Sequence, residues 1–254
     1  MGDMTSDRPK CMVELNDGET VFERQIRILR NCGIREFVIT TGPYPEQLKA
    51  VAARYRDLSF TFVANPEYES TNYIVSMYYA RKEITDDVLL LHGDLVFNES
   101  LICKMLGDER ASLCLYHQTK ELPDKDFKGR FENGFLREVS VCIFDKDCYA
   151  FQPLYKLSKS DVEKWLSAVE DFVENGDLGV YAENALNSIL DTLRIPGMSY
   201  HEDYIEEIDN QEDYIRVLAE ISEWDKKGQQ IIISDSSDRT IRELLPVNQP
   251  VFIV

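Results

Sequence analysis

Short apolar runs alternate with amphipathic stretches in the first half of this chain, and this alternation constrains the fold more than any other feature. Residues 21–32 carry apolar side chains at helical spacing, and Gly33 follows them as a helix stop. Further along the chain, strand-like runs cover 36–41, 58–64 and 87–91, and helical stretches cover 46–55 and 72–84. Strands that alternate with helices predict a mostly parallel sheet with helices on both faces, a three-layer α/β/α fold.

The second half has a different pattern. Short segments separated by turns such as Asn133-Gly134 predict antiparallel or mixed strands that extend the sheet, over 112–118, 128–132, 135–141 and 148–153. They belong to a flap or lid region that we place at about 111–190. Three helices and one strand complete the expectation, with helices over 160–175, 181–193 and 210–224 and a strand over 204–208.

We expect two parts along the chain, a domain over 1–226 and a tail over 227–254. The tail contains a strand-like run at 231–233, a helical stretch over 238–245 and a strand-like run from Pro250 to Val254. Because the chain ends on five largely apolar residues, two readings stay open. The tail is either a linker with the start of a further domain, or a strand docked on a neighbour.

Charge and cysteine usage exclude several classes of protein. The net charge of −18 argues against nucleic acid and against an anionic membrane surface as partners. No apolar run reaches the roughly 18 residues of a membrane span, and the polar start is not a signal peptide. Six cysteines without a CxxC pair favour buried thiols in a reducing compartment over a zinc site, which predicts a cytoplasmic protein.

Charged residues at three places in the sequence are candidates for binding phosphate or a metal ion. Lys10, fixed behind Pro9, can offer a point charge to phosphate oxygens, or it is an ordinary solvated lysine. Asp94 follows the apolar strand 87–91, a common place for a magnesium ligand, although a turn or cap aspartate also fits. Glu207 and Asp209 lie two apart on a predicted strand and point to the same side, and Asp209 can also cap the following helix.

The order of these motifs resembles the nucleotidyltransferase family with the sugar-nucleotidyltransferase-like, Rossmann-like fold. The resemblance rests on Arg8-Pro9-Lys10-Cys11, then Gly42, then Gly93-Asp94, then Glu207-Ile208-Asp209. Within that family, Ser70-Thr71-Asn72-Tyr73-Ile74-Val75-Ser76-Met77 is similar to a segment of phosphocholine cytidylyltransferases and of their phosphonate-activating relatives. In the family, a strand and a glycine-rich loop precede the arginine, and this sequence starts after them. The resemblance therefore describes an N-terminally incomplete domain.

The resemblance implies a set of site residues. Arg8 and Lys10 would be catalytic, with Lys10 facing the phosphates, and Asp94 and Asp209 would bind Mg²⁺. The cytosine and ribose would be surrounded by Gly42, Thr71, Asn72 and Ser76. The acceptor would lie near Glu183, Glu207, Lys128, Lys156 and Tyr181.

The activity that the resemblance implies is transfer of CMP from CTP to phosphocholine or to a small amino- or hydroxyalkyl phosphonate, with release of pyrophosphate. His92 stands where phosphocholine enzymes often have another acid, which favours a phosphonate acceptor. Two alternatives stay open: a sugar-1-phosphate nucleotidyltransferase, and a truncated, non-catalytic domain of the same fold. A homodimer and a fusion to a further C-terminal domain are both compatible with the sequence.

Overall fold

The structure is a computed structural model that describes residues 7–16, 18–234 and 250–254 of the 254 residues. The predicted helix over 238–245 falls outside this described part. Among the described helices, none is both long enough and apolar enough to cross a membrane.

A mixed sheet of nine strands forms the centre of the described chain, in the order β2-β1-β11-β3-β8-β5-β9, with β6 paired to β8 and β7 paired to β6. Neighbours from β2 to β3 are parallel, whereas β8 runs antiparallel to both β3 and β5. The strands are β1 (Glu36–Thr41), β2 (Ser59–Ala64), β3 (Val88–Leu91), β5 (Leu113–His117), β6 (Lys128–Glu132), β7 (Phe135–Ser140), β8 (Cys148–Leu157), β9 (Gly197–Ser199) and β11 (Val251–Ile253). The predicted mostly parallel mixed sheet is thus confirmed.

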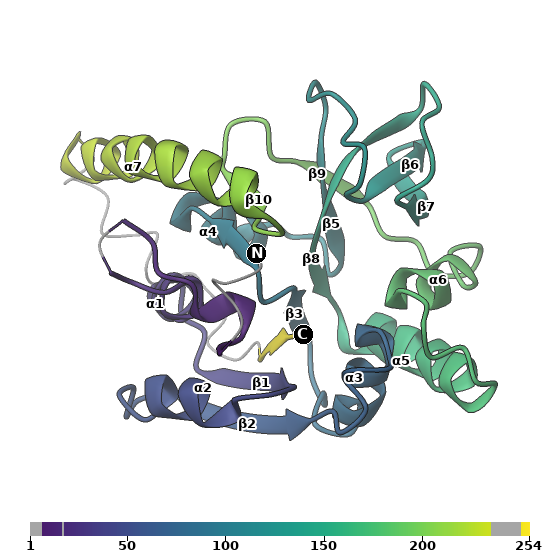
Figure 1. The fold of residues 1–254 in the computed structure, drawn as a ribbon. Helices are drawn as coiled ribbons and strands as arrows, with labels where there is room; N and C mark the ends of the chain where they lie inside the picture. The colour runs from purple at the N-terminus through teal and green to yellow at the C-terminus, as the bar shows by residue number, and fades with distance from the viewer. Residues whose placement is uncertain (1–6, 17, 235–249) are drawn as a thin grey trace.

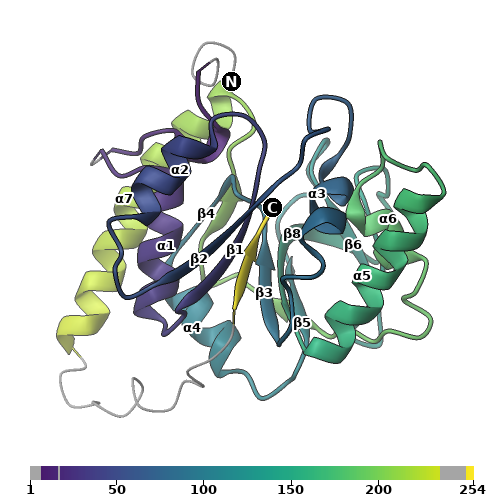
Figure 2. The same cartoon turned by 90° about the horizontal axis from the view of Figure 1, so that it is seen from below.

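Strand β11 lies in the middle of this sheet, between β1 and β3 (Figure 2). Phe252 pairs with Val38 on one side and with Leu90 on the other, both in parallel register. All three residues of β11 are buried, so the last described segment belongs to the core of the fold. The predicted strand at Pro250–Val254 is confirmed, while the predicted boundary near residue 226 stays a prediction.

Helices cover both faces of the sheet (Figures 1 and 2). One face carries α1 (Val21–Asn31), α2 (Pro45–Ala52) and α4 (Glu99–Gly107), and the other carries α3 (Tyr73–Ala80), α5 (Lys159–Glu174) and α6 (Ala182–Asn187). Alternate residues of β3 face opposite sides, since Leu89 and Leu91 pack with the first group and Val88 and Leu90 with the second. Helix α1 begins at a capping box, in which Thr20 and Glu23 satisfy each other's backbone amides.

A small second sheet pairs β4 (Leu95–Phe97) with β10 (Ile205–Glu207) in antiparallel register, next to α7 (Gln211–Ser234). Val217 and Ile221 attach α7 to a core cluster that includes Leu15 and Val96. This arrangement ties β10, and the acidic residues near it, to the loop that follows β3.

Candidate active site

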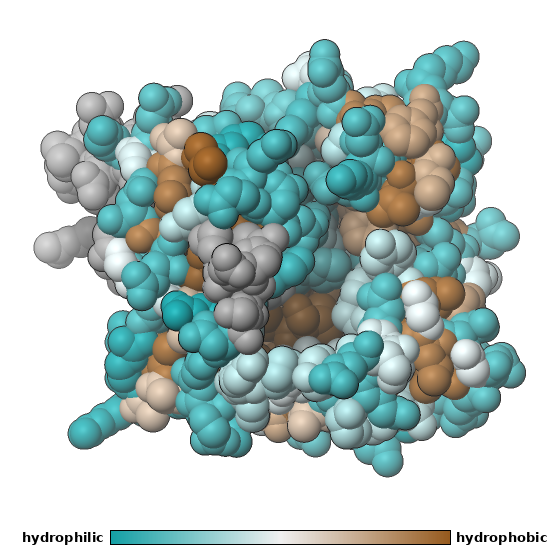
Figure 3. Space-filling view, viewed as in Figure 1, coloured by the Kyte–Doolittle hydropathy of each residue, from teal (hydrophilic) through white to brown (hydrophobic). Residues whose placement is uncertain are grey.

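A pocket of about 290 Å³ opens where β1, β3 and β11 end. In Figure 3 the molecular face is hollowed near its centre, with hydrophobic residues on the floor and hydrophilic residues around the rim. Gly42 follows β1, Asp94 follows β3 and Val254 follows β11, and all three line the pocket. A crevice at the carboxyl ends of the strands is the usual ligand position in open α/β sheets, and Gly42 and Asp94 both lie there.

Lys10 joins two acidic residues from distant parts of the chain at this pocket. Its Nζ lies 2.5 Å from Oδ1 of Asp209 and 3.5 Å from Oδ2 of Asp94. Burial lowers the pKa of Lys10, but Asp94 and Asp209 outweigh that effect and raise the pKa above its usual value. The ammonium group is therefore held in its charged form at neutral pH.

Gln25 on α1 fixes the loop that carries Asp94. Its Nε2 donates to three backbone carbonyls, those of His92, Gly93 and Leu95, at 3.2, 3.2 and 2.8 Å. The residue is almost completely buried, at 1% exposure. Gln25 was not among the site residues predicted from the sequence. A signal was present, because Gln25 is a polar residue on the apolar face formed by Phe22, Ile26 and Leu29.

Two further acids, Glu207 and Asp126, lie close to Asp94 and Asp209. Oε1 of Glu207 lies 3.5 Å from Nδ1 of His92. Ligand atoms of His92, Asp94 and Glu207 lie within 4.8 Å of one another, as do those of Asp126, Glu207 and Asp209. Burial raises the pKa of Glu207 to about 7, and the neighbouring Asp94 and Asp209 act in the same direction. Burial, followed by Asp209, likewise raises the pKa of Asp126. This concentration of negative charge suits a bound cation.

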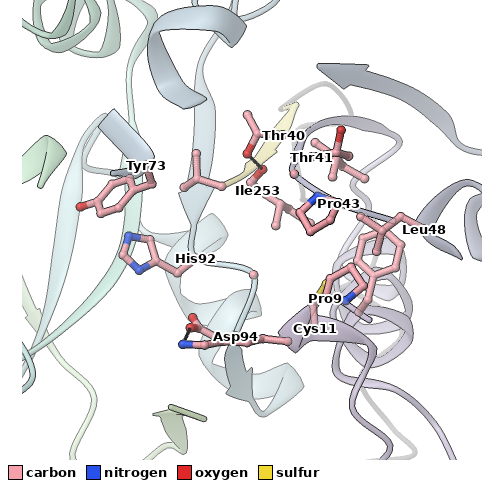
Figure 4. Close-up of a pocket in the computed structure, with 16 residues that line it drawn as sticks. Pro9, Cys11, Thr40, Thr41, Pro43, Leu48, Tyr73, His92, Asp94 and Ile253 are labelled. Carbon is pink, nitrogen blue, oxygen red and sulfur yellow. Dashed lines mark hydrogen bonds and ion pairs between the residues drawn. The ribbon is translucent and has the colours of Figure 1, made fainter. Parts of the chain in front are cut away.

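Aromatic rings gather at the same end of the pocket. The rings of Tyr73 and His92 lie side by side beyond Asp94 in Figure 4, with centroids 4.6 Å apart. Tyr181, the N-cap residue of α6, contacts Tyr73 and Phe127. Of these residues, only Tyr181 was selected from the sequence. Phe127 lies in a loop that no motif distinguished.

Of the residues predicted to surround the nucleotide, Gly42 lines the pocket, and the ring of Tyr68 packs against it. A Cβ at Gly42 would lie 3.1 Å from that ring, so a larger residue would displace it. Thr71 and Ser76 bind the amide of Asn65, and Asn72 caps α3 through the backbone amide of Tyr73. These side chains fix the loop between β2 and α3, which places Tyr73 at the pocket.

Among the predicted acceptor residues, Tyr181 contacts Tyr73 and Glu207 lies beside His92. The third, Glu183, lies on α6 two residues after Tyr181. Glu183 is buried on α6 and accepts a 2.9 Å hydrogen bond from the hydroxyl of Tyr155. Burial raises its pKa to about 8, and Glu207 contributes in the same direction.

Of the predicted site residues, only Lys10, Gly42 and Asp94 line the pocket itself. Three of the others, Lys128, Lys156 and Arg8, have their charged groups bound elsewhere. The ammonium of Lys128 donates to the carbonyls of Pro123, Asp124, Asp126 and Val141, and thereby holds the loop that carries Asp126. Lys156 pairs with Leu89 near the start of β3, the end of the strand away from the pocket. Its ammonium group donates to the carbonyl of Asp108. Arg8 forms an exposed ion pair with its neighbour Asp7.

Comparison with known proteins agrees with this arrangement. The sequence model of the MobA-like NTP transferase domain matches residues 1–171, about two thirds of the chain, and the chain belongs to this family. It is a nucleotidyltransferase. The fold is shared with the solved CTP:phosphocholine cytidylyltransferase from Streptococcus pneumoniae, at a TM-score of 0.69 and 18% identity over 87% of this chain and 93% of that one.

Two relatives match at higher identity over a smaller part of the chain. The chain is 24% identical over 198 residues to the CTP:phosphoglutamine cytidylyltransferase of Campylobacter jejuni, covering 71% of this chain and 76% of that protein. It is 28% identical over 113 residues to the CMP-5'-(3-aminopropyl)phosphonate synthase of Streptomyces rubellomurinus. That match spans 44% of this chain but only 18% of the relative's length.

Proposed function

We propose that this nucleotidyltransferase moves the CMP group of CTP onto a small phosphorylated or phosphonate acceptor and releases pyrophosphate in a Mg²⁺-dependent reaction. The observation that carries the proposal is the position of Lys10 between Asp94 and Asp209 in a pocket at the carboxyl ends of the strands. The named activities of the relatives, which use CTP and different acceptors, support the choice of nucleotide.

Asp94 and Asp209 fit a divalent cation. Both carboxylates converge on one positive charge, that of Lys10, and Oδ1 of Asp94 is buried without a hydrogen-bond partner among the described residues. Carboxylate oxygens are the ligands that Mg²⁺ prefers. In the proposed site Asp94 and Asp209 would hold Mg²⁺, which would neutralise charge on the phosphates.

The residues of the chain supply positioning and charge. An oxygen of the acceptor attacks the α-phosphorus of CTP in line, the bond to the bridging oxygen breaks, and pyrophosphate leaves with that electron pair. No covalent bond to the protein is needed. Lys10, held protonated by its two carboxylates, offers its ammonium to the phosphate oxygens where negative charge develops. Gln25 keeps Asp94 in place for this task.

Nucleotide and acceptor occupy opposite ends of the pocket in this proposal. The cytosine and ribose lie near Gly42 and the loop that contains Thr71, Asn72 and Ser76. The acceptor lies near Glu207, Tyr181 and Glu183. A cytoplasmic location is also proposed, because buried thiols such as Cys114 persist in a reducing compartment.

The test is a pyrophosphate-release assay of the 254-residue chain with CTP and Mg²⁺. Phosphocholine, phosphoethanolamine, 2-aminoethylphosphonate and glucose 1-phosphate would be compared, each also with ATP, GTP and UTP. The proposal expects turnover that requires CTP and an amine-bearing or other small non-sugar acceptor. Turnover with glucose 1-phosphate alone would instead support the sugar-1-phosphate alternative. Absence of turnover, together with absence of CTP binding by calorimetry, would support a non-catalytic domain.

A further inference from the structure

Two cysteines from distant parts of the chain lie in contact away from the pocket. Sγ of Cys32 lies 2.9 Å from Sγ of Cys103, and the two residues are 71 positions apart in sequence. Cys32 is the C-cap residue of α1, Cys103 lies within α4, and neither lines the pocket. Both are free thiols, so a hydrogen bond between the two S–H groups joins them and no covalent bond does.

Packing between α1 and α4 holds the two sulfur atoms together. The helices lie on the same face of the sheet and share one core cluster (Figure 2). Nδ2 of Asn31 donates a 2.8 Å hydrogen bond to Oε2 of Glu99 at the start of α4, and the thiol of Cys32 lies 3.8 Å from the carbonyl oxygen of Glu99. A disulfide bond joins its sulfur atoms at about 2.05 Å. Closing the bond between Cys32 and Cys103 therefore takes a movement of about 1 Å, which needs no displacement of either helix.

The two thiols differ in how easily an oxidant reaches them. Cys32 is 1% exposed, whereas Cys103 is partly exposed. The hydrogen bond with Cys103, together with burial, raises the pKa of the Cys32 thiol above its usual range. Because the thiolate is the reactive form, Cys32 is protected from direct oxidation. Cys103 is therefore the sulfur that an oxidant meets first, and Cys32 is placed to react with the oxidised product.

From this contact we propose that Cys32 and Cys103 are a reversible oxidation site that forms a disulfide with hydrogen peroxide as the oxidant. Peroxide oxidises the thiol of Cys103 to a sulfenic acid and is itself reduced, which releases one water molecule. The sulfur of Cys32 then attacks the sulfur of Cys103, the S–O bond breaks, and the hydroxyl group leaves as a second water with the proton of Cys32. Two thiols and one hydrogen peroxide thus give one disulfide and two waters. A dithiol reductant reverses the reaction by thiol–disulfide exchange.

The disulfide ties α1, which holds the Asp94 loop through Gln25, to α4, which follows that loop in sequence. The bond closes a long stretch of chain that contains β1, β2, α3 and β3. Closing a long loop restricts the unfolded chain much more than the folded one, so it stabilises the fold. Disulfides that form in a reducing compartment are usually transient and sense oxidants. The pair is therefore a latch that strengthens this half of the fold during oxidative stress.

The test treats the 254-residue chain with hydrogen peroxide, caps the remaining thiols with N-ethylmaleimide and digests the product with trypsin. Cleavage after lysine and arginine places Cys32 on the peptide 31–35 and Cys103 on the peptide 83–104. Mass spectrometry should find these two peptides joined after peroxide and separate after dithiothreitol. The Tm of the intact chain should rise by about 5–15 °C on oxidation and return on reduction, as expected for a disulfide that closes a long loop.

The variants Cys32→Ala and Cys103→Ala should each lose both the joined peptides and the rise in Tm. Cys142→Ser, which removes an exposed thiol between β7 and β8, is the matched control and should keep both. If an alanine variant fails to fold, the peptide analysis of the unmodified chain still decides the question. Both cysteines capped by N-ethylmaleimide, or each oxidised separately without a joined peptide, would overturn the proposal, as would a disulfide that leaves Tm unchanged. None of these measurements uses CTP or an acceptor, so their outcome is independent of the proposed function.

Discussion

The ammonium group of Lys10 lies 2.5 Å from Oδ1 of Asp209, although 199 residues separate the two in sequence. This contact brings the start of the described chain together with the segment between β10 and α7, directly beside Asp94. Neither residue is in an unusual sequence context by itself. Their contact across the pocket turns two ordinary charges into a site that suits phosphate and a metal ion.

Replacing Lys10 by Met should impair the chemical step more than nucleotide binding. Loss of a positioned charge at a reacting phosphate lowers kcat by about a hundred- to a thousandfold. Lys10→Arg should keep part of the activity because it retains the charge, but guanidinium geometry differs from that of an ammonium. Steady-state pyrophosphate release measures the effect. The exposed control Lys49→Met should be unaffected, and an equal loss in that variant would contradict the assignment.

The metal assignment predicts a change in Mg²⁺ dependence for Asp94→Asn and Asp209→Asn. Each variant removes one negative ligand, so the Mg²⁺ concentration for half-maximal activity should rise by tenfold or more, by analogy with lost ligands in other metal sites. Treatment with EDTA should abolish activity of the unmodified chain, and added Mg²⁺ should restore it. The exposed Asp191→Asn is the matched control. An unchanged Mg²⁺ titration in both site variants would remove these residues from the metal site.

Gln25→Ala should weaken both the fold and the metal site without altering a ligand. The substitution removes the Gln25 donor from the backbone carbonyls of His92, Gly93 and Leu95, of which the carbonyl of His92 still accepts from the Leu95 amide. An unsatisfied buried polar group costs about 1–3 kcal/mol, so we expect the free energy of unfolding to fall by a few kcal/mol. Urea unfolding measures this loss, and the Mg²⁺ titration should shift in the same variant. Gln118→Ala, at an exposed position, should change neither quantity.

Strand β11 makes a direct prediction about stability. Phe252 is fully buried between β1 and β3, so Phe252→Ala should lower the free energy of unfolding by about 3–5 kcal/mol. Ile215, which is 60% exposed on α7, provides the control, since Ile215→Ala should cost less than about 0.5 kcal/mol. Thermal and urea unfolding compare the two. Similar small losses in both variants would show that β11 is not part of the folded sheet.

Glu183 should make stability depend on pH. Its pKa is raised from 4.5 to about 8 by burial, so between these values the folded state keeps a proton that the unfolded state has released. Stability should therefore fall as pH rises from about 4.5 to 8, and each unit of pKa difference corresponds to about 1.4 kcal/mol as an upper limit. Glu183→Gln should reduce this fall and leave the part that Glu207 contributes, whereas Glu170→Gln should keep all of it. Parallel pH profiles for the unmodified chain and Glu183→Gln would contradict the burial argument.

Local patterns in the sequence were sufficient for much of the fold. The helix over 21–32 and the strand over 36–41 were predicted within a residue, because their hydrophobic periods are strong and a glycine or a loop limits each one. Strand β4, helix α4 and strand β9 were missed. β4 and β9 have three residues each, too few to show a period, and their positions depend on pairing with distant strands. Ile231–Ile233 looked like a strand because of its β-branched residues, but it continues helix α7.

The site was only partly predictable for a related reason. A residue that follows a predicted strand, such as Asp94, can be placed from the sequence, because the carboxyl end of the strand lies at the crevice. Lys128 and Lys156 were selected for their charge, yet their ammonium groups bind backbone carbonyls that only the folded chain brings near. Phe127 lies in a loop that Lys128 holds through backbone carbonyls, so its contact with Tyr181 could not be predicted from its neighbours in sequence.

The most direct test of the proposed reaction follows the α-phosphorus of CTP itself. CTP labelled at the α-phosphate would be incubated with Mg²⁺ and phosphoethanolamine, and the products would be separated and identified by mass spectrometry. We predict that the label moves into a CMP–acceptor conjugate, in a yield equal to the pyrophosphate released, and that Asp94→Asn lowers this yield at the same limiting Mg²⁺ concentration. Label that stays in CTP, or that appears only in free CMP with every acceptor supplied, would contradict the account.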